Sequence, residues 1–176
     1  MQAYNRYMKE IEIKFAVVDV RSVCEKLKTL GFRISVGRHL EKNLLFDDGE
    51  SVLKKSGRLL RLRKTSAGQT VTFKGPILPD SDLKCREEVE CRCDDASLME
   101  QILAGIGFKV TMQYSKFRTV FERDVLTVSV DETEAGNFLE GEGPSPEAVE
   151  SIGRQLGFSK QDYVRRPYAE LIRSEE

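Results

Sequence analysis

Alternating charged residues near the N-terminus are the first in this chain that could do chemistry. The stretch reads Glu10-Ile11-Glu12-Ile13-Lys14-Phe15. In an extended strand successive side chains point to opposite faces, so the two acids and the lysine share one face and the apolar residues share the other. One strand with a charged face is also typical of the solvated side of an amphipathic sheet. For this strand alone, a functional site and an ordinary solvent-facing surface are both open interpretations.

Other expected strands repeat the pattern with complementary charges. Taking one face of each strand collects the acids Glu10, Glu12, Glu88, Glu90, Asp131, Glu140 and Glu142, and the bases Lys14, Arg61, Arg63, Lys74, Arg86, Lys116 and Arg118. An open antiparallel sheet with helices on one side and water on the other would explain the alternation. It explains less easily why Ser, Gln and Asn are nearly absent from the polar face. We therefore favour an α+β fold with a closed antiparallel barrel, a charged lumen and helices packed outside.

A closed lumen of this kind predicts a metal ion and a polyanion. Buried charges are costly unless compensated, and carboxylates such as Glu140 and Glu142 with Glu10 and Glu12 would repel one another. A divalent cation relieves that repulsion, and ligation by oxygen alone suits Mg²⁺ or Mn²⁺. Arg and Lys bind phosphate oxygens, so a triphosphate that carries its own metal would satisfy both sets. The sequence has no Gly-rich phosphate loop, which predicts that side chains hold the phosphates.

Length and composition define the class of protein. The 176 residues fit one domain spanning 1–176, and 28 Lys plus Arg against 29 Asp plus Glu give a net charge of -1. This balance provides no field for nucleic acid or a membrane surface. No apolar run reaches the length of a membrane span and the N-terminus lacks a signal-peptide pattern, so we expect a cytoplasmic protein. The cysteines, expected to be reduced core residues, and the single His39 do not form a metal-binding pattern; the cysteines are Cys24, Cys85, Cys91 and Cys93.

Three expected helices share the same ending. Asp19 is a predicted N-cap, a second helix begins near Asp95, and a third follows Pro144-Ser145-Pro146. Each is followed by a Gly-Phe pair: Gly31-Phe32, Gly107-Phe108 and Gly157-Phe158. A left-handed glycine with the next apolar side chain folded back on the last turn would explain all three.

Strands are expected between these helices, separated by turn residues. After the opening strand, the predicted strands are 39–46, 58–64, 70–74, 84–93, 114–123, 126–131 and 136–142. Asp47-Asp48-Gly49 is a predicted turn, residues 64–69 a hairpin loop and residues 77–83 a mobile surface loop. Each half runs from an acid-x-acid strand through a helix to strands with paired bases, which suggests two related halves closing one sheet.

Six short motifs, in order, resemble those of the CYTH superfamily, the triphosphate tunnel metalloenzymes. They are Glu10-x-Glu12-x-Lys14, Leu60-Arg61-Leu62-Arg63, Thr72-Phe73-Lys74-Gly75-Pro76, Arg86-x-Glu88-x-Glu90, Lys116-x-Arg118, and Asp131 followed by Gly136-x-Phe138-x-Glu140-x-Glu142. Each motif is weak alone, but the ordered set covers the chain from about Met8 to the C-terminal tail. The resemblance implies an eight-stranded antiparallel barrel that forms a tunnel, in agreement with the charge pattern.

The resemblance also assigns roles to residues. It implies metal ligands or their supports at Glu10, Glu12, Asp131, Glu140 and Glu142, with a second metal served by Glu88 and Glu90. It implies triphosphate contacts at Lys14, Arg61, Arg63, Lys74, Arg86, Lys116 and Arg118. The expected catalytic residues are Glu12 and Lys14, with Lys14 either activating a nucleophile or remaining a protonated anion contact.

One segment departs from the family pattern, and the role of another segment is open. Relatives often carry an acid and a Tyr before the Phe-Asp pair, whereas this chain reads Lys42-Asn43-Leu44-Leu45-Phe46-Asp47, so no base-specific contact is carried over there. The tail Arg165-Arg166-Pro167-Tyr168 resembles the family's C-terminal segment. It either closes one tunnel mouth or forms an exposed end helix.

The resemblance implies two chemistries at the same site. We expect a class IV adenylyl cyclase-like enzyme that converts ATP to cyclic AMP and pyrophosphate. The alternatives are a triphosphate hydrolase acting on inorganic triphosphate, thiamine triphosphate or another organic triphosphate, and a non-catalytic protein that binds triphosphate or polyphosphate. Outward-facing Cys and Phe residues fit packing under helices better than a homodimer surface, which stays the alternative.

Overall fold

The strands of this protein form a closed antiparallel barrel. The structure is a computed structural model that describes residues 6–78 and 83–173. The strand order around the barrel is β1-β5-β4-β3-β2-β6-β7-β8, which confirms the predicted eight-stranded α+β fold. The strands are β1 (Arg6–Val17), β2 (Arg33–Asp47), β3 (Leu59–Thr65), β4 (Gly68–Lys74), β5 (Lys84–Cys93), β6 (Lys109–Arg123), β7 (Leu126–Thr133) and β8 (Gly136–Glu142).

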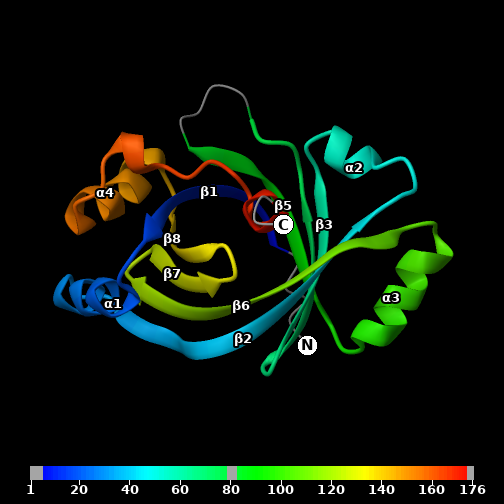
Figure 1. Ribbon diagram of the computed structural model, residues 1–176, viewed down its shortest axis with the longest axis horizontal. Coiled ribbons are helices and arrows are strands. Elements are labelled where there is room, and N and C mark those ends of the chain that lie inside the picture. Colours follow the sequence, from blue (N-terminus) through cyan, green and yellow to red (C-terminus); the bar gives the residue numbers. More distant parts are fainter. Residues whose placement is uncertain (1–5, 79–82, 174–176) are drawn as a thin grey trace. The chain divides into compact units, whose positions relative to one another are not determined.

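Helices connect the strands and follow the last of them (Figure 1). The α-helices of the described chain are α1 (Val20–Thr29), α2 (Val52–Lys55), α3 (Ala96–Gly105), α4 (Pro146–Leu156) and α5 (Tyr168–Arg173), with a 3-10 turn at Lys160–Asp162. None of them combines the length and apolarity needed to cross a membrane.

The helix ends follow the sequence prediction. Asp19, Asp95 and Ser145 accept backbone N–H bonds as the N-caps of α1, α3 and α4. Gly31, Gly107 and Gly157 have φ values of 86°, 95° and 92°. After each glycine, the phenylalanine N–H donates back to the helix: Phe32 to Leu27 O at 3.0 Å, Phe108 to Leu103 O at 2.9 Å, and Phe158 to Gly153 O at 2.9 Å. These bonds satisfy carbonyl groups that a helix end leaves without partners.

Contacts divide the chain into two compact units. Among the described residues, the first unit comprises 6–9, 40–78 and 86–115, and the second comprises 10–39, 83–85 and 116–173. β1, β2, β5 and β6 contribute residues to both units. That the chain is a single domain stays a prediction.

The second unit buries the apolar face of β1 beneath helices. Ile11, Ile13 and Phe15 belong to one core with Leu27 of α1 and Ile152 of α4. At Gly153 of α4, an added Cβ would lie 2.5 Å from Phe15 Cζ, so only glycine allows this close approach. Since the helices cover the apolar face, the opposite face with Glu10, Glu12 and Lys14 points into the barrel.

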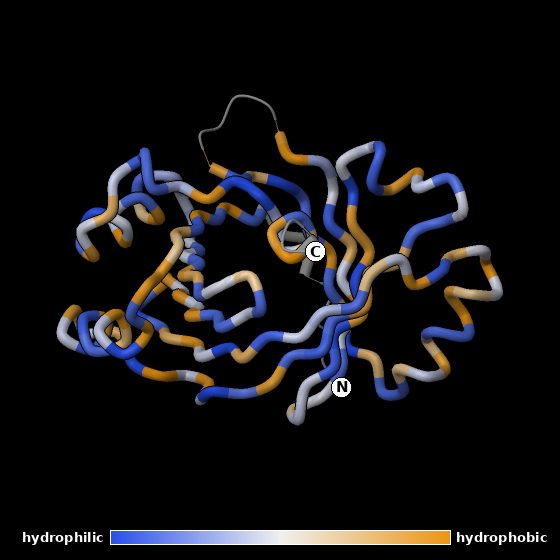
Figure 2. The backbone as a smooth tube through the Cα atoms, in the orientation of Figure 1, coloured by the Kyte–Doolittle hydropathy of each residue, from blue (hydrophilic) through white to orange (hydrophobic). Residues whose placement is uncertain are grey.

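The first unit repeats this arrangement around α3. Leu44 and Phe46 of β2 and Leu62 of β3 pack with Ala96 and Leu103 of α3. The intervening residues of β2 and β3 therefore lie on the charged face. Figure 2 shows the alternation of hydrophilic and hydrophobic residues along the strands.

Several predicted boundaries and one cysteine assignment were wrong. β2 begins at Arg33, six residues before the predicted start: the alternating Ile34 and Val36 were not recognised as strand residues, and all of the first six residues are exposed. β6 begins at Lys109 instead of residue 114. The helix α2 follows the predicted turn at Asp47 and was missed, because four residues carry no helical period. The predicted loop at 77–83 lies largely outside the described residues. The four cysteines are free, but Cys91 is exposed and lies outside the core.

Candidate metal and phosphate sites

Three carboxylates of the second unit form a cluster that could hold a metal ion. One oxygen each from Glu10, Glu12 and Glu142 lies within 4.8 Å of the other two. The register of β1 and β8 explains this placement, because Glu12 pairs with Glu142 across the ladder. Glu10 and Glu12 are buried, with exposed fractions of 8% and 6%.

The donor set of this cluster fits a hard divalent cation. Three carboxylates supply only oxygen ligands, and Mg²⁺ or Mn²⁺ completes its coordination with water and substrate phosphate. The Lys84 ammonium, 2.9 Å from Glu12 Oε1, offsets part of the negative charge. A divalent ion bound between the two buried carboxylates and the partly buried third would relieve their mutual repulsion.

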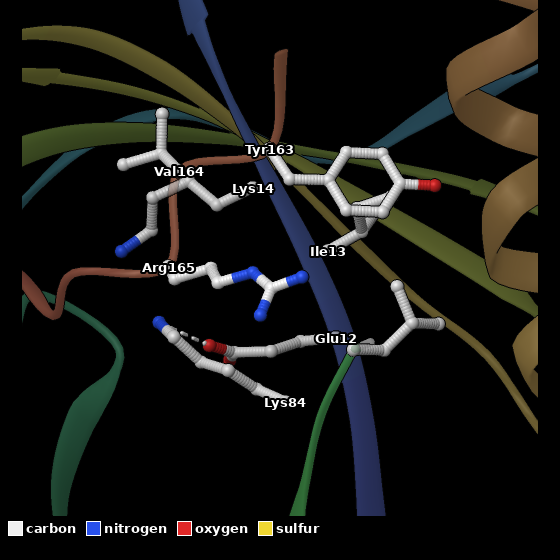
Figure 3. Close-up of a pocket in the computed structure, with 8 residues that line it drawn as sticks. Glu12, Ile13, Lys14, Lys84, Tyr163, Val164 and Arg165 are labelled. Atoms are coloured by element: carbon white, nitrogen blue, oxygen red, sulfur yellow. Dashed lines mark hydrogen bonds and ion pairs between the residues drawn. The ribbon is translucent and has the colours of Figure 1, made fainter. Parts of the chain in front are cut away.

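Lys84 also lines a small pocket beside the cluster. The pocket is lined by Glu12, Ile13, Lys14, Leu83, Lys84, Tyr163, Val164 and Arg165. Figure 3 shows a dashed line for the ion pair between the Glu12 and Lys84 side chains, and the Arg165 side chain on the same side of β1. The pocket therefore presents several cationic groups next to the candidate metal ligands.

Lys14 is held firmly on β1, two residues beyond Glu12. Its Nζ lies 3.2 Å from Glu140 Oε1, donates to the Arg166 carbonyl at 3.3 Å and sits 3.8 Å from the centre of the Tyr168 ring. Burial lowers the pKa of Lys14 below its ordinary value, although Glu140 opposes the shift. The ammonium is thus fixed in place, and its neutral form is more accessible than that of an exposed lysine.

Asp131 is the centre of a second charged network in the same unit. It accepts from Lys116 at 2.7 Å, from Arg118 through two bonds of 2.6 Å, and from the Tyr168 hydroxyl at 2.6 Å. Arg118 also donates to Glu140 at 2.5 Å. Burial alone would raise the pKa of Asp131 and of Glu140, but the facing cations more than offset it and lower both.

The first unit carries a separate group of ion pairs on its charged face. Arg63 lies 3.2 Å from Glu41, Lys74 lies 2.9 Å from Glu88, and Arg61 lies 3.8 Å from Glu90. Thr72 links the last pair, because it accepts from Arg61 at 3.2 Å and donates to Glu90 at 2.7 Å. Burial would lower the pKa of Arg61, but Tyr114, Glu88, Glu41 and Glu90 raise it, so the guanidinium stays charged.

The structure sorts the predicted site residues into these groups. Of the predicted metal ligands, Glu10, Glu12 and Glu142 come together. Asp131 and Glu140 instead hold Lys14, Lys116 and Arg118, while Glu88 and Glu90 pair with cations of the first unit. Arg86 is half-buried on β5, on the same face as Glu88 and Glu90.

Sequence reasoning missed several residues of these groups. Lys84 is two residues before Arg86, so the two-residue period of β5 could have placed it on the charged face. Glu41 and Asn43 could have been found in the same way on β2. Tyr168 was noted only as part of the C-terminal tail; its contact with Asp131 was not predicted, because only tertiary folding brings α5 to Asp131.

The chain was compared with known proteins. The CYTH domain model matches residues 8–168. This chain belongs to the CYTH domain family. A relative of Methanocaldococcus jannaschii, named "Putative adenylate cyclase", is 31% identical over 93% of this chain and 98% of its own length.

Solved structures share the fold over nearly the whole chain. The PH1819 protein of Pyrococcus horikoshii matches with a TM-score of 0.80 and 26% identity, covering 95% of this chain and 99% of that one. A protein of Vibrio parahaemolyticus matches with a TM-score of 0.83 and 19% identity, covering 96% and 99%. A Hippeastrum protein, described as having a dominant triphosphatase activity, matches with a TM-score of 0.71 and 22% identity, covering 95% and 96%. At 19% and 22% sequence identity, the likeness to the Vibrio and Hippeastrum proteins shows the fold alone.

Family membership defines the broad chemistry. CYTH domain proteins are enzymes, with adenylate cyclase or triphosphatase activities ascribed to them, and they depend on metal ions in general. Nucleotides or other triphosphates are their substrates. The carboxylate cluster of this chain is the feature that such a metal requires.

Proposed function

We propose that this CYTH protein is a metal-dependent adenylyl cyclase that converts ATP to cyclic AMP and pyrophosphate. The observation that carries the metal-dependent part is the cluster of Glu10, Glu12 and Glu142, with ligand oxygens within 4.8 Å of one another. The choice of the cyclase reaction is supported by the name of the archaeal relative, which matches at 31% identity over almost its full length.

The residues of the second unit have distinct parts in this proposal. Glu10, Glu12 and Glu142 would hold Mg²⁺ or Mn²⁺, which supplies charge stabilisation at the phosphoryl oxygens when it is bound. Lys14 is fixed by Glu140 and by the Arg166 carbonyl, and either activates the ribose 3′-hydroxyl or contacts the phosphates as a cation. Asp131 and Glu140 hold Lys116 and Arg118 ready for phosphate contacts. They act on the cations, in this proposal, and serve the metal only indirectly.

The first unit carries its own set of phosphate-binding cations in this proposal. Arg61, Arg63 and Lys74 each have a carboxylate partner on the same charged face, which fixes their side chains before substrate arrives. Preorganised cations stabilise developing charge on phosphoryl oxygens without reorganising during the reaction. Arg86 completes this set in our assignment.

Hydrolysis is the second candidate function. The same carboxylates and cations would serve water attacking a terminal phosphorus as well as a ribose hydroxyl attacking the α-phosphorus. Inorganic triphosphate, thiamine triphosphate or another organic triphosphate would then be the substrate. A triphosphate-binding protein without turnover is the remaining alternative.

Product analysis distinguishes these functions. The protein is incubated with ATP, thiamine triphosphate and inorganic triphosphate in turn, with Mg²⁺ or Mn²⁺, and the products are identified by phosphorus NMR. We expect cyclic AMP and pyrophosphate from ATP. Release of phosphate alone would establish a hydrolase, and tight binding without any product would establish a binding protein.

The metal requirement has its own test in Glu12→Gln. This change removes a carboxylate ligand while keeping the side-chain shape, so we expect turnover to fall by about a hundredfold or more. Glu50→Gln, at an exposed position, is the matched control and should keep wild-type turnover. Full activity of a folded Glu12→Gln protein, or of the wild type in excess chelator, would contradict the metal-dependent mechanism.

A further inference from the structure

Asn43 is a buried polar residue that none of the predicted site assignments includes. It lies on β2 next to Leu44, whose side chain packs beneath α3. The opposite face of the strand is the charged face, which carries Glu41. Alternation along the strand puts Asn43 on that charged face. Its exposed fraction is 0%, and it is among the largest fully buried side chains of the described protein.

The orientation of the Asn43 amide is determined by Arg63. Arg63 Nε, which can only donate, bonds to Asn43 Oδ1 at 3.2 Å. The amide oxygen must therefore face Arg63, and the Nδ2 group must point away from it. Within the described residues, Asn43 Nδ2 has no hydrogen-bond acceptor.

Arg61 carries a second buried N–H donor that has no acceptor among the described residues. Its terminal nitrogen donates to Thr72, yet its Nε finds no acceptor in the described part of the chain. Arg61 is two residues from Arg63 on β3, and Arg63 pairs with Asn43 across the ladder. Asn43 and Arg61 are thus diagonal neighbours on one face of the sheet, a position at which backbone Cα atoms lie about 7–8 Å apart. Two buried donors without acceptors are uncommon, because each loses its bonds to water on folding.

The charge of the neighbouring side chains indicates what the missing acceptor is. Glu90 Oε2 lies 3.8 Å from the terminal nitrogen of Arg61, and this ion pair leaves the Arg61 Nε group without an acceptor in the described part of the chain. One of the two unused N–H groups belongs to the Arg61 guanidinium, and a charged donor next to a neutral amide donor suits an anionic oxygen with several lone pairs better than a neutral carbonyl. A phosphoryl oxygen has this character.

We propose that Asn43 is a substrate-binding residue, whose Nδ2 group donates to a phosphoryl oxygen that Arg61 also contacts. The proposal rests on the proposed function, since it takes a triphosphate as the ligand. It adds a neutral donor to a set otherwise made of cations. Such a donor fixes the orientation of a phosphoryl group without adding charge.

Binding of inorganic triphosphate, measured by titration calorimetry with Mg²⁺ present, tests this proposal. Asn43→Leu removes the donor at similar volume, and we expect affinity to fall by about ten- to a hundredfold. Asn43→Asp is the second variant: it keeps an acceptor for Arg63, removes the donor, and should also weaken binding at least about tenfold. Asn137→Asp makes the same chemical change on β8, on the face opposite Glu140, and should bind as the wild type does.

A double-variant cycle separates a direct contact from a role in orienting Arg63. If Asn43 contacts the ligand, Asn43→Leu weakens binding by a similar factor in the wild type and in Arg63→Leu. If its effect disappears in the Arg63→Leu background, Asn43 acts only through Arg63 and the proposal is overturned. Wild-type affinity of Asn43→Leu overturns it as well.

The same titrations separate this proposal from the proposed function. A wild-type protein that binds triphosphate but turns nothing over overturns the enzyme, and the Asn43 contact is still judged from the variants. A wild-type protein that binds no triphosphate overturns both.

Discussion

At the scale of single residues, Tyr168 joins the tail to the charged interior of the second unit. Its hydroxyl donates to Asp131 at 2.6 Å, and its ring lies 3.8 Å from Lys14 Nζ and 4.4 Å from Lys116 Nζ. Burial, Glu140 and Asp131 raise the pKa of Tyr168 well above its usual value, so the phenol stays protonated and remains a donor. The tail is therefore anchored by a buried aromatic residue, and of the two interpretations left open for the tail, an exposed end helix does not describe Tyr168.

Replacing Tyr168 by Phe tests how much this hydroxyl contributes. The ring contacts with Lys14 and Phe138 stay, but Asp131 loses one of its donors. Because Lys116 and Arg118 still compensate the carboxylate, we expect the free energy of unfolding to fall by about 1–2 kcal/mol. Urea denaturation at pH 7 measures this change.

Tyr168→Ala serves as the comparison for that measurement. It removes the ring as well, so its loss of stability should exceed that of Tyr168→Phe by about 2 kcal/mol or more. Equal stability of the Phe variant and the wild type would mean that the hydroxyl bond adds nothing to the fold.

At the scale of elements, α2 shows how one carboxylate can organise a segment without helical periodicity. Asp47 at the end of β2 accepts from the backbone N–H groups of Asp48, Leu53 and Lys54, each at 2.9 Å. Burial alone would raise the pKa of Asp47, but these three donors lower it below its ordinary value. The short helix is therefore tied to β2 by an ionised side chain.

Asp47→Ala is expected to destabilise the protein by about 2 kcal/mol at pH 7, because three N–H groups lose their acceptor. The contribution has a defined pH dependence. Since the folded pKa lies below the unfolded value of about 3.9, the stabilisation is present above that pH and is lost as the pH falls through the folded pKa. Urea denaturation between pH 7 and pH 3 should show the wild type and Asp47→Ala converging.

Asp94→Ala is the matched control for this element. Asp94 is exposed, and its removal should change the free energy of unfolding by less than about 0.5 kcal/mol at every pH. A constant gap between wild type and Asp47→Ala down to pH 3 would contradict the role assigned to the ionised carboxylate.

At the scale of the whole molecule, the two compact units share four strands. β1, β2, β5 and β6 each contribute residues to both units, and the strand order closes on itself. A chain organised in this way cannot unfold one unit without disrupting strands that continue into the other. We therefore predict that the 176 residues unfold as one domain.

Two tryptophan reporters test this cooperativity, since the protein contains no tryptophan. Phe108→Trp reports on the core of the first unit and Phe158→Trp on that of the second. We expect the urea midpoints from fluorescence to coincide with each variant's own midpoint from circular dichroism. A fluorescence midpoint separated from the circular dichroism transition in either variant would mean that the units unfold independently.

The alternation of charged and apolar faces, the helix caps and the Gly-Phe endings could all be predicted from the amino-acid sequence. These features are local, because a strand's two faces and a helix's termini depend on residues within a few positions of one another. The sequence also favoured a closed barrel over an open sheet, because the polar faces of the strands carry charged residues and few Ser, Gln or Asn. Glu10, Glu12, Glu140 and Glu142 were predicted to lie together. Three of them form the cluster, whereas Glu140 pairs with Lys14 and Arg118.

The pairing of the remaining charges could not be predicted without the tertiary structure. Whether a carboxylate such as Asp131 faces other acids or faces cations depends on strand register and on the docking of α5, which involve residues far apart in the chain. The same holds for Asn43, whose unused donor can be recognised only once Arg63 has taken its oxygen. Distances between side chains of separate strands, and not residue types, determine which charged groups are left to bind a ligand.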